Sequence, residues 1–236
     1  MNTPTTPEDG TRFVPDSLYN VFAYLCTGML FISVCILLFS DLSLLLRGWK
    51  ALELAGQLAV VLFVLSAVYV YSEFISVISY HVIRRPVSSL VRLLNPKGAS
   101  DFFFDHKELL TRFDVLKQFP DKQKGNYWTL IYAAKIKHPA IGNDMLERHA
   151  RVKMSRMNAL NSFVVFLMAL YSRTFEPAIL ENSLIRKPHV SFLVLFVSLL
   201  GTLMFAFEFY QRQCWFGDIV LKISASLSRL EKDERS

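Results

Sequence analysis

The residues of this chain best suited to binding a ligand are basic, and they gather in one short stretch. Residues 147–168 read ERHARVKMSRMNALNSFVVFLM, so four cations lead directly into a hydrophobic run: Arg148, Arg151, Lys153 and Arg156. Neither proline nor glycine interrupts the stretch, which predicts one continuous helix. Its charged half could bind an anion, and its apolar half could enter a membrane.

Helical spacing places apolar side chains on one side of this helix and basic ones around the rest. The apolar stripe consists of Leu146, Ala150, Met154 and Met157. We therefore expect a basic stalk that packs along this stripe. His149 lies among its cations, in surroundings that disfavour binding a second positive charge.

Three interpretations of the basic stalk are open. The cations can bind anionic lipid headgroups and fix the topology, or pair with nearby acids, namely Asp101, Asp105, Glu108 and Asp114. They can instead bind the phosphates of a nucleotide or oligonucleotide, with aromatic side chains stacking on its bases. The candidate ligand-binding residues are then Arg148, Arg151, Lys153, Lys135, Lys137, Trp128 and Tyr132. Aromatic residues at this spacing more often form a small core, in which Trp128 would hold the insert together.

The apolar residues of the chain occur in long clumps. Of its 236 residues, 53% are hydrophobic, and the mean hydropathy is +0.33, which is high for a soluble domain. A helix needs about 20 apolar residues to cross a bilayer. Four stretches are candidates: residues 19–40, 54–78, 157–171 and 190–210. The third is short, so it either tilts and extends into the basic stalk or is a buried helix of the ordinary soluble kind.

The distribution of charge predicts the orientation. Residues 84–156 hold 15 of the 26 Lys and Arg residues and 7 of the 20 Asp and Glu residues, a net charge of +8. Positive loops stay in the cytoplasm, so we expect this segment and both termini on the cytoplasmic side.

The predicted fold is an all-α membrane protein with four transmembrane helices in two hairpins and a small, mainly helical insert between spans two and three. The expected segments are a cytoplasmic N-terminus, a first hairpin, a basic cytoplasmic domain, a second hairpin and a helical tail, over residues 1–18, 19–83, 84–156, 157–211 and 212–236. Trp49 with Arg47 and Lys50 is typical of an interfacial anchor in the first hairpin loop. The second span is expected to continue as helix to the RRP sequence at residues 84–86.

Polar residues recur at one level of the predicted spans, near their cytoplasmic ends. The candidate pore-mouth residues are Glu73, Glu208, Asn161 and Arg156. One interpretation is interfacial ion pairing, in which Glu73 or Glu208 pairs with Arg156 or Arg212. The other is a ring of carboxylates at the mouth of an oligomeric pore, which would favour cations.

Motifs of catalysis are missing from the sequence. It contains no G-x-S-x-G, no P-loop, no G-x-G-x-x-G after a strand and no H-E-x-x-H. The five histidines and three cysteines lack metal-ligand spacing. We therefore expect neither an enzyme nor a cofactor or metal site.

The layout, with a polar helix NDMLERHARVKMSRMNALNSF running into span three, resembles four-span membrane effectors of bacterial antiviral defence systems signalled by nucleotides. The resemblance concerns the layout alone and assigns no ligand residue. It implies a homo-oligomer in the inner membrane that opens when a nucleotide or oligonucleotide, made by a partner nucleotidyltransferase, binds its cytoplasmic part. Depolarisation would then arrest the infected cell. The alternative is a non-conducting scaffold, or accessory subunit, that recruits a soluble partner.

Overall fold

The part of the chain described by the computed structural model, residues 16–94, 139–175 and 180–233, is helical and contains no strand. This confirms the all-α prediction for those residues. The elements in chain order are α1 (Asp16–Phe39), α2 (Leu42–Ala51), α3 (Leu54–Ser79), the π-helical turn η1 (Tyr80–Arg84), α4 (Arg85–Leu94), α9 (Pro139–Phe175), the 3-10 turn η3 (Leu184–Arg186) and α10 (Pro188–Asp233).

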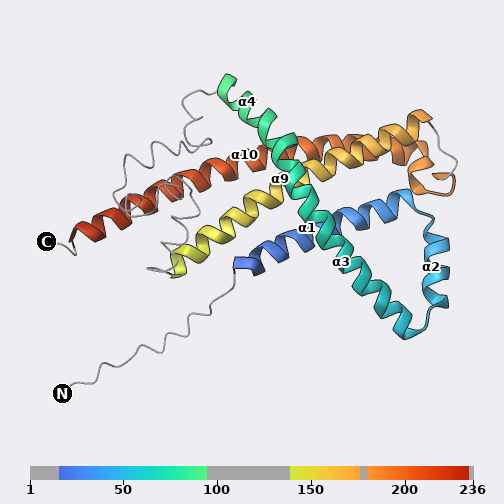
Figure 1. The fold of residues 1–236 in the computed structure, drawn as a ribbon. Coiled ribbons are helices and arrows are strands. Elements are labelled where there is room, and N and C mark those ends of the chain that lie inside the picture. The colour runs from blue at the N-terminus through green and yellow to red at the C-terminus, as the bar shows by residue number, and fades with distance from the viewer. Residues whose placement is uncertain (1–15, 95–138, 176–179, 234–236) are drawn as a thin grey trace, which may run out of the picture.

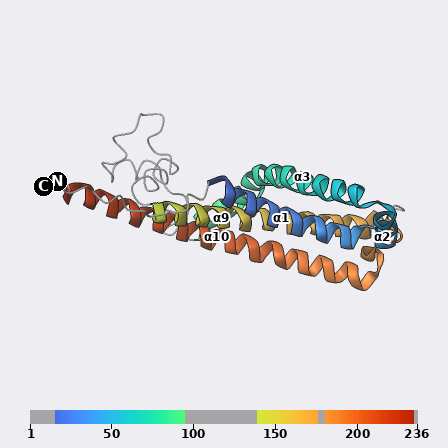
Figure 2. The ribbon, with the colours of Figure 1, turned by 90° about the horizontal axis from the view of Figure 1, so that it is seen from below.

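Helix α9 is the centre of the bundle. It lies along α10 over a long distance, and both α1 and α3 also pack on it (Figure 1). Viewed from below, α9 and α10 extend side by side beyond α1 (Figure 2). We call the end from which they project the stalk end, and the opposite end, formed by α2 and η3, the loop end.

The basic stalk and the apolar run that follows it form a single helix, as predicted. Helix α9 starts at Pro139, where the missing N–H costs nothing in the first turn. The predicted apolar stripe is buried at Leu146, Ala150 and Met157 and partly buried at Met154. Leu146 and Met157 belong to the main hydrophobic cluster, which also holds Phe216 of α10.

The apolar helices α1 and α3 approach each other very closely where they cross. A Cβ atom added to Gly28 would lie 2.8 Å from Val68 Cγ1 and 2.9 Å from the Val68 carbonyl oxygen. Beside it, the buried Ser72 hydroxyl donates a hydrogen bond of 2.8 Å to the carbonyl of Tyr24. A small residue is therefore required at the crossing, as in many packed membrane helices.

The helical chain that begins with α3 reaches the RRP sequence at residues 84–86, as expected, and continues through it into α4 by way of η1. The π-helical turn η1 ends at Arg84, two residues before Pro86. Here the chain passes from the apolar helix α3 to the basic helix α4. Pro86 has no backbone N–H and cannot complete the α-helical bond to residue 82, which explains why the ladder changes here.

The first hairpin loop contains a helix that was not predicted. Asp41 caps α2 by accepting hydrogen bonds from the backbone N–H groups of Ser43 and Leu44. The hydrogen bond from the Ser43 hydroxyl, with that from the Leu44 N–H, holds the pKa of Asp41 below its usual range. The exposed side chains of α2 include leucines and Trp49 beside Arg47 and Lys50, the composition of a helix lying in a membrane interface.

Three of the described helical stretches, and not four, are long and apolar enough to cross a membrane: Val21–Phe39, Leu54–Val91 and Pro188–Gly217. The third predicted span, residues 157–171, is helical but lies in α9, which has no stretch of that apolarity. The reason is the position of α9. Because it packs between the other helices, its polar side chains, Asn158 and Asn161 among them, line the interior of the bundle.

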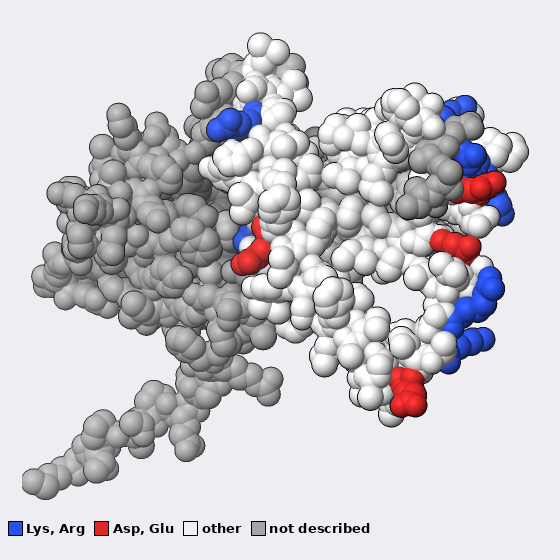
Figure 3. Space-filling model, turned by 45° about the vertical axis from the view of Figure 1, so that its right-hand side comes forward, with Lys and Arg blue, Asp and Glu red and all other residues white. Residues whose placement is uncertain are grey.

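Charge-free stretches of similar length nevertheless occur in α3, α9 and α10. They run between Glu53 and Glu73, Arg156 and Arg173, and Lys187 and Glu208, which are about 30, 26 and 31 Å along a helix. In the face that Figure 3 presents, most charged side chains gather at the loop end or toward the stalk end, and a broad band without charge lies between.

Replacing Gly28 by valine should destabilise the crossing of α1 and α3, because the added carbons meet backbone as well as side-chain atoms of α3. Overpacking of this kind costs about 1–3 kcal/mol. We expect the detergent-solubilised variant to melt several degrees below the unmodified protein.

The matched control is Gly48→Val on α2, since an added Cβ meets no atom within 4 Å there. Equal melting temperatures for the two variants would contradict the close approach at Gly28.

Candidate functional site

Three positive side chains from two elements converge where α9 enters the bundle at its stalk end. Lys153 and Arg156 come from α9, and Arg84 comes from the last residue of η1. All three act on His149, one turn before Lys153 on α9, as neighbouring positive charges. We call these three cations the cationic junction.

Arg156 joins α9 to the end of α3. Its Nε donates a hydrogen bond of 3.0 Å to the Ser79 hydroxyl, and its Nη2 donates one of 3.2 Å to the Ser76 carbonyl. Its guanidinium also lies over the ring of Tyr80, 5.4 Å from the centroid. A guanidinium with several donors in a fixed plane can hold two groups at once, so Arg156 fixes the angle at which α9 passes α3.

Lys153 and Arg84 each lie over an aromatic ring. Lys153 donates a hydrogen bond to the Tyr24 hydroxyl of α1 and lies over that ring, 4.5 Å from its centroid. Arg84 lies over Tyr80, the ring that Arg156 also approaches, at 4.6 Å. Two guanidinium groups near one ring concentrate positive charge, which an anionic ligand would neutralise.

The pKa of His149 is lowered by burial and by the positive charges around it. Burial, with the positive charges of Lys153, Arg156 and Arg84, lowers the pKa of His149 to about 3. Its ring packs against Phe216 of α10 at 5.6 Å between centroids. The imidazole is therefore neutral at physiological pH, in agreement with the expectation that its surroundings disfavour an added cation.

The two arginines named first as ligand-binding candidates have partners on α9 itself. Arg148 binds Asp144 at 2.7 Å, and its guanidinium lies 4.3 Å from the ring centroid of Trp215 on α10. Arg151 pairs with Glu147, one helical turn earlier. Arg151 remains the more exposed of the two, with 59% of its side chain accessible against 25% for Arg148.

The remaining ligand-binding candidates, Lys135, Lys137, Trp128 and Tyr132, lie outside the described residues. So do the four acids with which the stalk was expected to pair. The described part of the predicted site is thus Arg148, Arg151 and Lys153, and the structure adds Arg84 and Arg156 to it.

The candidate pore-mouth residues have separate local environments. Glu208 pairs with Arg212 at 2.5 Å, one of the ion pairs that the sequence suggested. Asn161 is buried and accepts a hydrogen bond of 2.8 Å from the Tyr71 hydroxyl. Glu73 is exposed on α3, and Arg156 is joined to the end of α3.

Tyr24, Tyr71, Ser76, Ser79 and Tyr80 were not among the sequence candidates. Their roles depend on how α1, α3 and α9 cross, and no local pattern in the sequence reveals such a crossing. Among the described residues, no group of three or more His, Cys, Asp or Glu side chains could hold a metal ion.

Compared with family models, with curated proteins and with solved structures, the chain gives no match in any of the three.

The pKa of His149 predicts a pH dependence of stability. A histidine whose pKa is lowered from its usual 6.5 to about 3 binds fewer protons when folded than when unfolded over that range, so stability falls as the pH falls below about 6.5. The loss is at most about 1.4 kcal/mol per pH unit. We expect the melting temperature in detergent to decrease between pH 7 and pH 5.

His149→Gln should flatten this dependence, whereas His81→Gln, at an exposed position on η1, should leave it as in the unmodified protein. An unchanged slope in His149→Gln would show that the junction does not act on this histidine.

Proposed function

We propose that this chain is a subunit of a homo-oligomeric membrane pore opened by an anionic ligand, a nucleotide or oligonucleotide, at its cytoplasmic side. The observation that carries the proposal is the continuity of α9. One helix bears the basic stalk, contributes two cations of the junction and then lies at the centre of the apolar bundle. Binding at its charged half can therefore displace its apolar half as a rigid rod.

The topology proposed with this function has four membrane spans, with α9 as the third. Its charge-free stretch, about 26 Å long, is close to the roughly 30 Å thickness of the hydrocarbon core. The stalk end would lie in the cytoplasm, because the basic segment of the sequence belongs to that end. Both termini would then be cytoplasmic, in the inner membrane of a bacterium.

Assembly with further copies is supported by how little of each span is covered within one chain. Only 28%, 17% and 11% of the best apolar windows of the three membrane-length stretches are buried. Figure 3 also shows an opening between α3 and the rest of the first hairpin, toward the loop end. Copies packed around an axis could cover these faces and enclose a lumen that a single chain does not form.

Gating requires a ligand that binds the open state more tightly than the closed one. The cationic junction joins α9 to α1 through Lys153 and Tyr24 and to α3 through Arg156 and Ser79. An anion that competes for Lys153 or Arg156 would loosen these links and free α9 to move. Opening would depolarise the membrane, the outcome implied by the resemblance to antiviral effectors, and a partner nucleotidyltransferase would supply the ligand.

The second candidate function is a non-conducting scaffold or accessory subunit. It is favoured by the ion pairs of Arg148 with Asp144 and of Arg151 with Glu147, which leave these arginines less charge for a ligand. In that case the parts of α9 and α10 that project at the stalk end would present a docking surface to a soluble partner.

The proposal is tested by recording current across planar bilayers that contain the purified full chain, with and without candidate cyclic nucleotides and oligonucleotides. We expect ligand-dependent conductance, and we expect Arg148→Gln/Arg151→Gln to reduce the response at least about tenfold, as loss of two phosphate contacts implies.

The matched control is Arg47→Gln/Lys50→Gln, which removes two cations from α2 at the loop end. It should respond as the unmodified protein does. Absence of conductance under every ligand, together with stable binding of a soluble partner, would favour the scaffold instead.

A further inference from the structure

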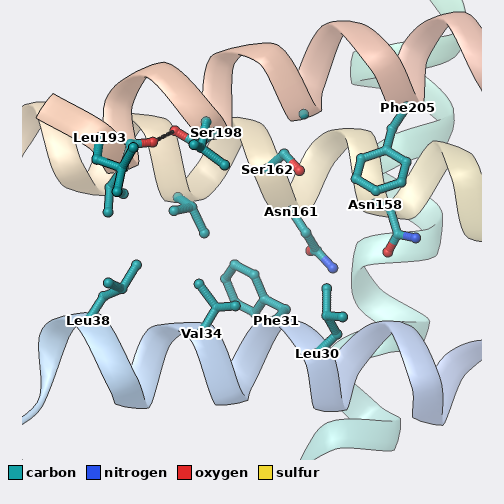
Figure 4. Close-up of a pocket in the computed structure, with 14 residues that line it drawn as sticks. Leu30, Phe31, Val34, Leu38, Asn158, Asn161, Ser162, Leu193, Ser198 and Phe205 are labelled. Atoms are coloured by element: carbon teal, nitrogen blue, oxygen red, sulfur yellow. Dashed lines mark hydrogen bonds between the residues drawn. The ribbon is translucent and has the colours of Figure 1, made fainter. Parts of the chain in front are cut away.

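A lateral groove runs along the bundle between α1 and α10. Both helices pack on α9 but hardly on each other, so α9 forms the floor of the groove. Figure 4 shows α1 on one side and α10 with α9 on the other, with side chains from all three pointing into the space. The space measures about 330 Å³, within the range of small-molecule pockets.

The polarity of the groove changes along its length. At one end the lining is aliphatic, with Leu38 of α1 and Leu193 of α10 (Figure 4). At the other end it holds the amides of Asn158 and Asn161, next to Phe205. Asn158 lies two residues after Arg156, so the polar end is the one nearer the cationic junction.

The amide of Asn161 is incompletely bonded where it faces the groove. Its side chain is only 4% exposed, and the Tyr71 hydroxyl binds Oδ1. Within the described part of the chain, Nδ2 of Asn161 and Oδ1 of Asn158 have no hydrogen-bond partner. A buried polar atom without a partner is unfavourable, so a ligand that accepts a hydrogen bond from Nδ2 of Asn161 gains binding free energy.

The length of the groove matches one leaflet of a bilayer. Its lining residues on α10 extend from Leu193 to Phe205, about 18 Å along the helix. Half of the hydrocarbon core of a bilayer is about 15 Å thick. An extended acyl chain of one leaflet would therefore run from the amides to the aliphatic end.

We propose that this groove binds one acyl chain of a membrane phospholipid, with the ester carbonyl of that chain accepting a hydrogen bond from Asn161. Leu30, Leu193 and Val197 line the groove and are also exposed on the outside of the bundle. The groove therefore opens sideways toward hydrocarbon, and a chain can enter from the bilayer. The site needs only the bundle in a membrane, and it does not depend on whether the bundle conducts.

The unpaired amide favours a lipid over a helix from a second copy. A transmembrane helix satisfies its own backbone groups and offers hydrocarbon side chains along most of its surface. It would cover the aliphatic end of the groove but leave Asn161 unpaired unless it carried a matching polar residue. An ester supplies an acceptor at the polar end and an unbranched chain over the rest.

The test uses the purified full chain reconstituted with phosphatidylglycerol that carries a diazirine in one acyl chain. After illumination, mass spectrometry maps the labelled residues. We expect labels on residues 30–38 of α1 and 193–205 of α10, on the sides of both helices that line the groove. Val197→Trp, which places a large ring in the groove, should lower this labelling about tenfold or more.

Val70→Trp is the matched control, since Val70 is exposed on α3 and does not line the groove. It should leave the labelling unchanged. Asn161→Leu removes the amide nitrogen that would donate to the ester and should reduce labelling.

Three outcomes would overturn the proposal. Labelling spread evenly over α1, α3 and α10 would identify ordinary surrounding lipid. Labelling in Val197→Trp equal to that of the unmodified protein would show that the chain does not occupy the groove. A change of oligomeric mass in Val197→Trp but not in Val70→Trp would indicate that a second copy lies there.

Discussion

The interior of a bilayer offers no water to pair with polar groups, and in the proposed topology this constraint accounts for the position of α9. Its apolar run contains Asn158 and Asn161, and its charged half ends at Arg156. Such a helix cannot face hydrocarbon on all sides without leaving amides unpaired. The bundle places it centrally, where Tyr71 binds Asn161 and the end of α3 binds Arg156.

The more apolar helices then take the outer positions. Helices α1, α3 and α10 have large exposed hydrophobic side chains along their spans, as expected for surfaces that meet lipid or other copies. Helix α10 packs along α9 over a long distance. Helix α1 contacts α9 through Tyr24, and α3 contacts it through Tyr71, Ser76 and Ser79. One polar helix thus organises three apolar ones, and the lateral groove is the space that this arrangement leaves between α1 and α10.

The continuity of α9 also relates the charged stalk to the apolar bundle. The expected segment boundaries at residues 156/157 and 211/212 both fall inside helices, within α9 and α10. Neither the stalk nor the tail is hinged to the spans by a loop at these points. In the proposed gating, a displacement of the stalk would pass along this helix to its contact with α3, where Arg156 is bonded to Ser76 and Ser79.

Much of this architecture could be predicted from the sequence. Three of the four apolar clumps are membrane-length helices, and helical spacing predicted the buried stripe at Leu146, Ala150 and Met157. The pairs Asp144–Arg148 and Glu147–Arg151 are also visible in the sequence as i, i+4 spacings, although the stalk acids were sought in the neighbouring segment instead.

The other features depend on contacts between distant segments. Hydropathy takes no account of neighbouring helices, which bury Asn161 and partly bury Asn158 of α9. The bonds of Lys153 with Tyr24 and of Arg156 with Ser79 join residues far apart in the chain, so that only the helix crossings bring them together. Helix α2 was missed because its signal, the Asp41 cap, stands in a short loop that was interpreted as a turn.

The central claim, that α9 crosses the membrane despite its moderate hydropathy, is tested most directly by single-cysteine labelling in intact cells. In a variant whose Cys26, Cys35 and Cys214 are replaced by serine, a cysteine is placed either at Ala140 or at Thr174, both exposed near opposite ends of α9. With a membrane-impermeant maleimide, we expect the Thr174 position to be labelled from outside and the Ala140 position only after permeabilisation. Labelling of both positions from the same side would show that α9 does not span the bilayer.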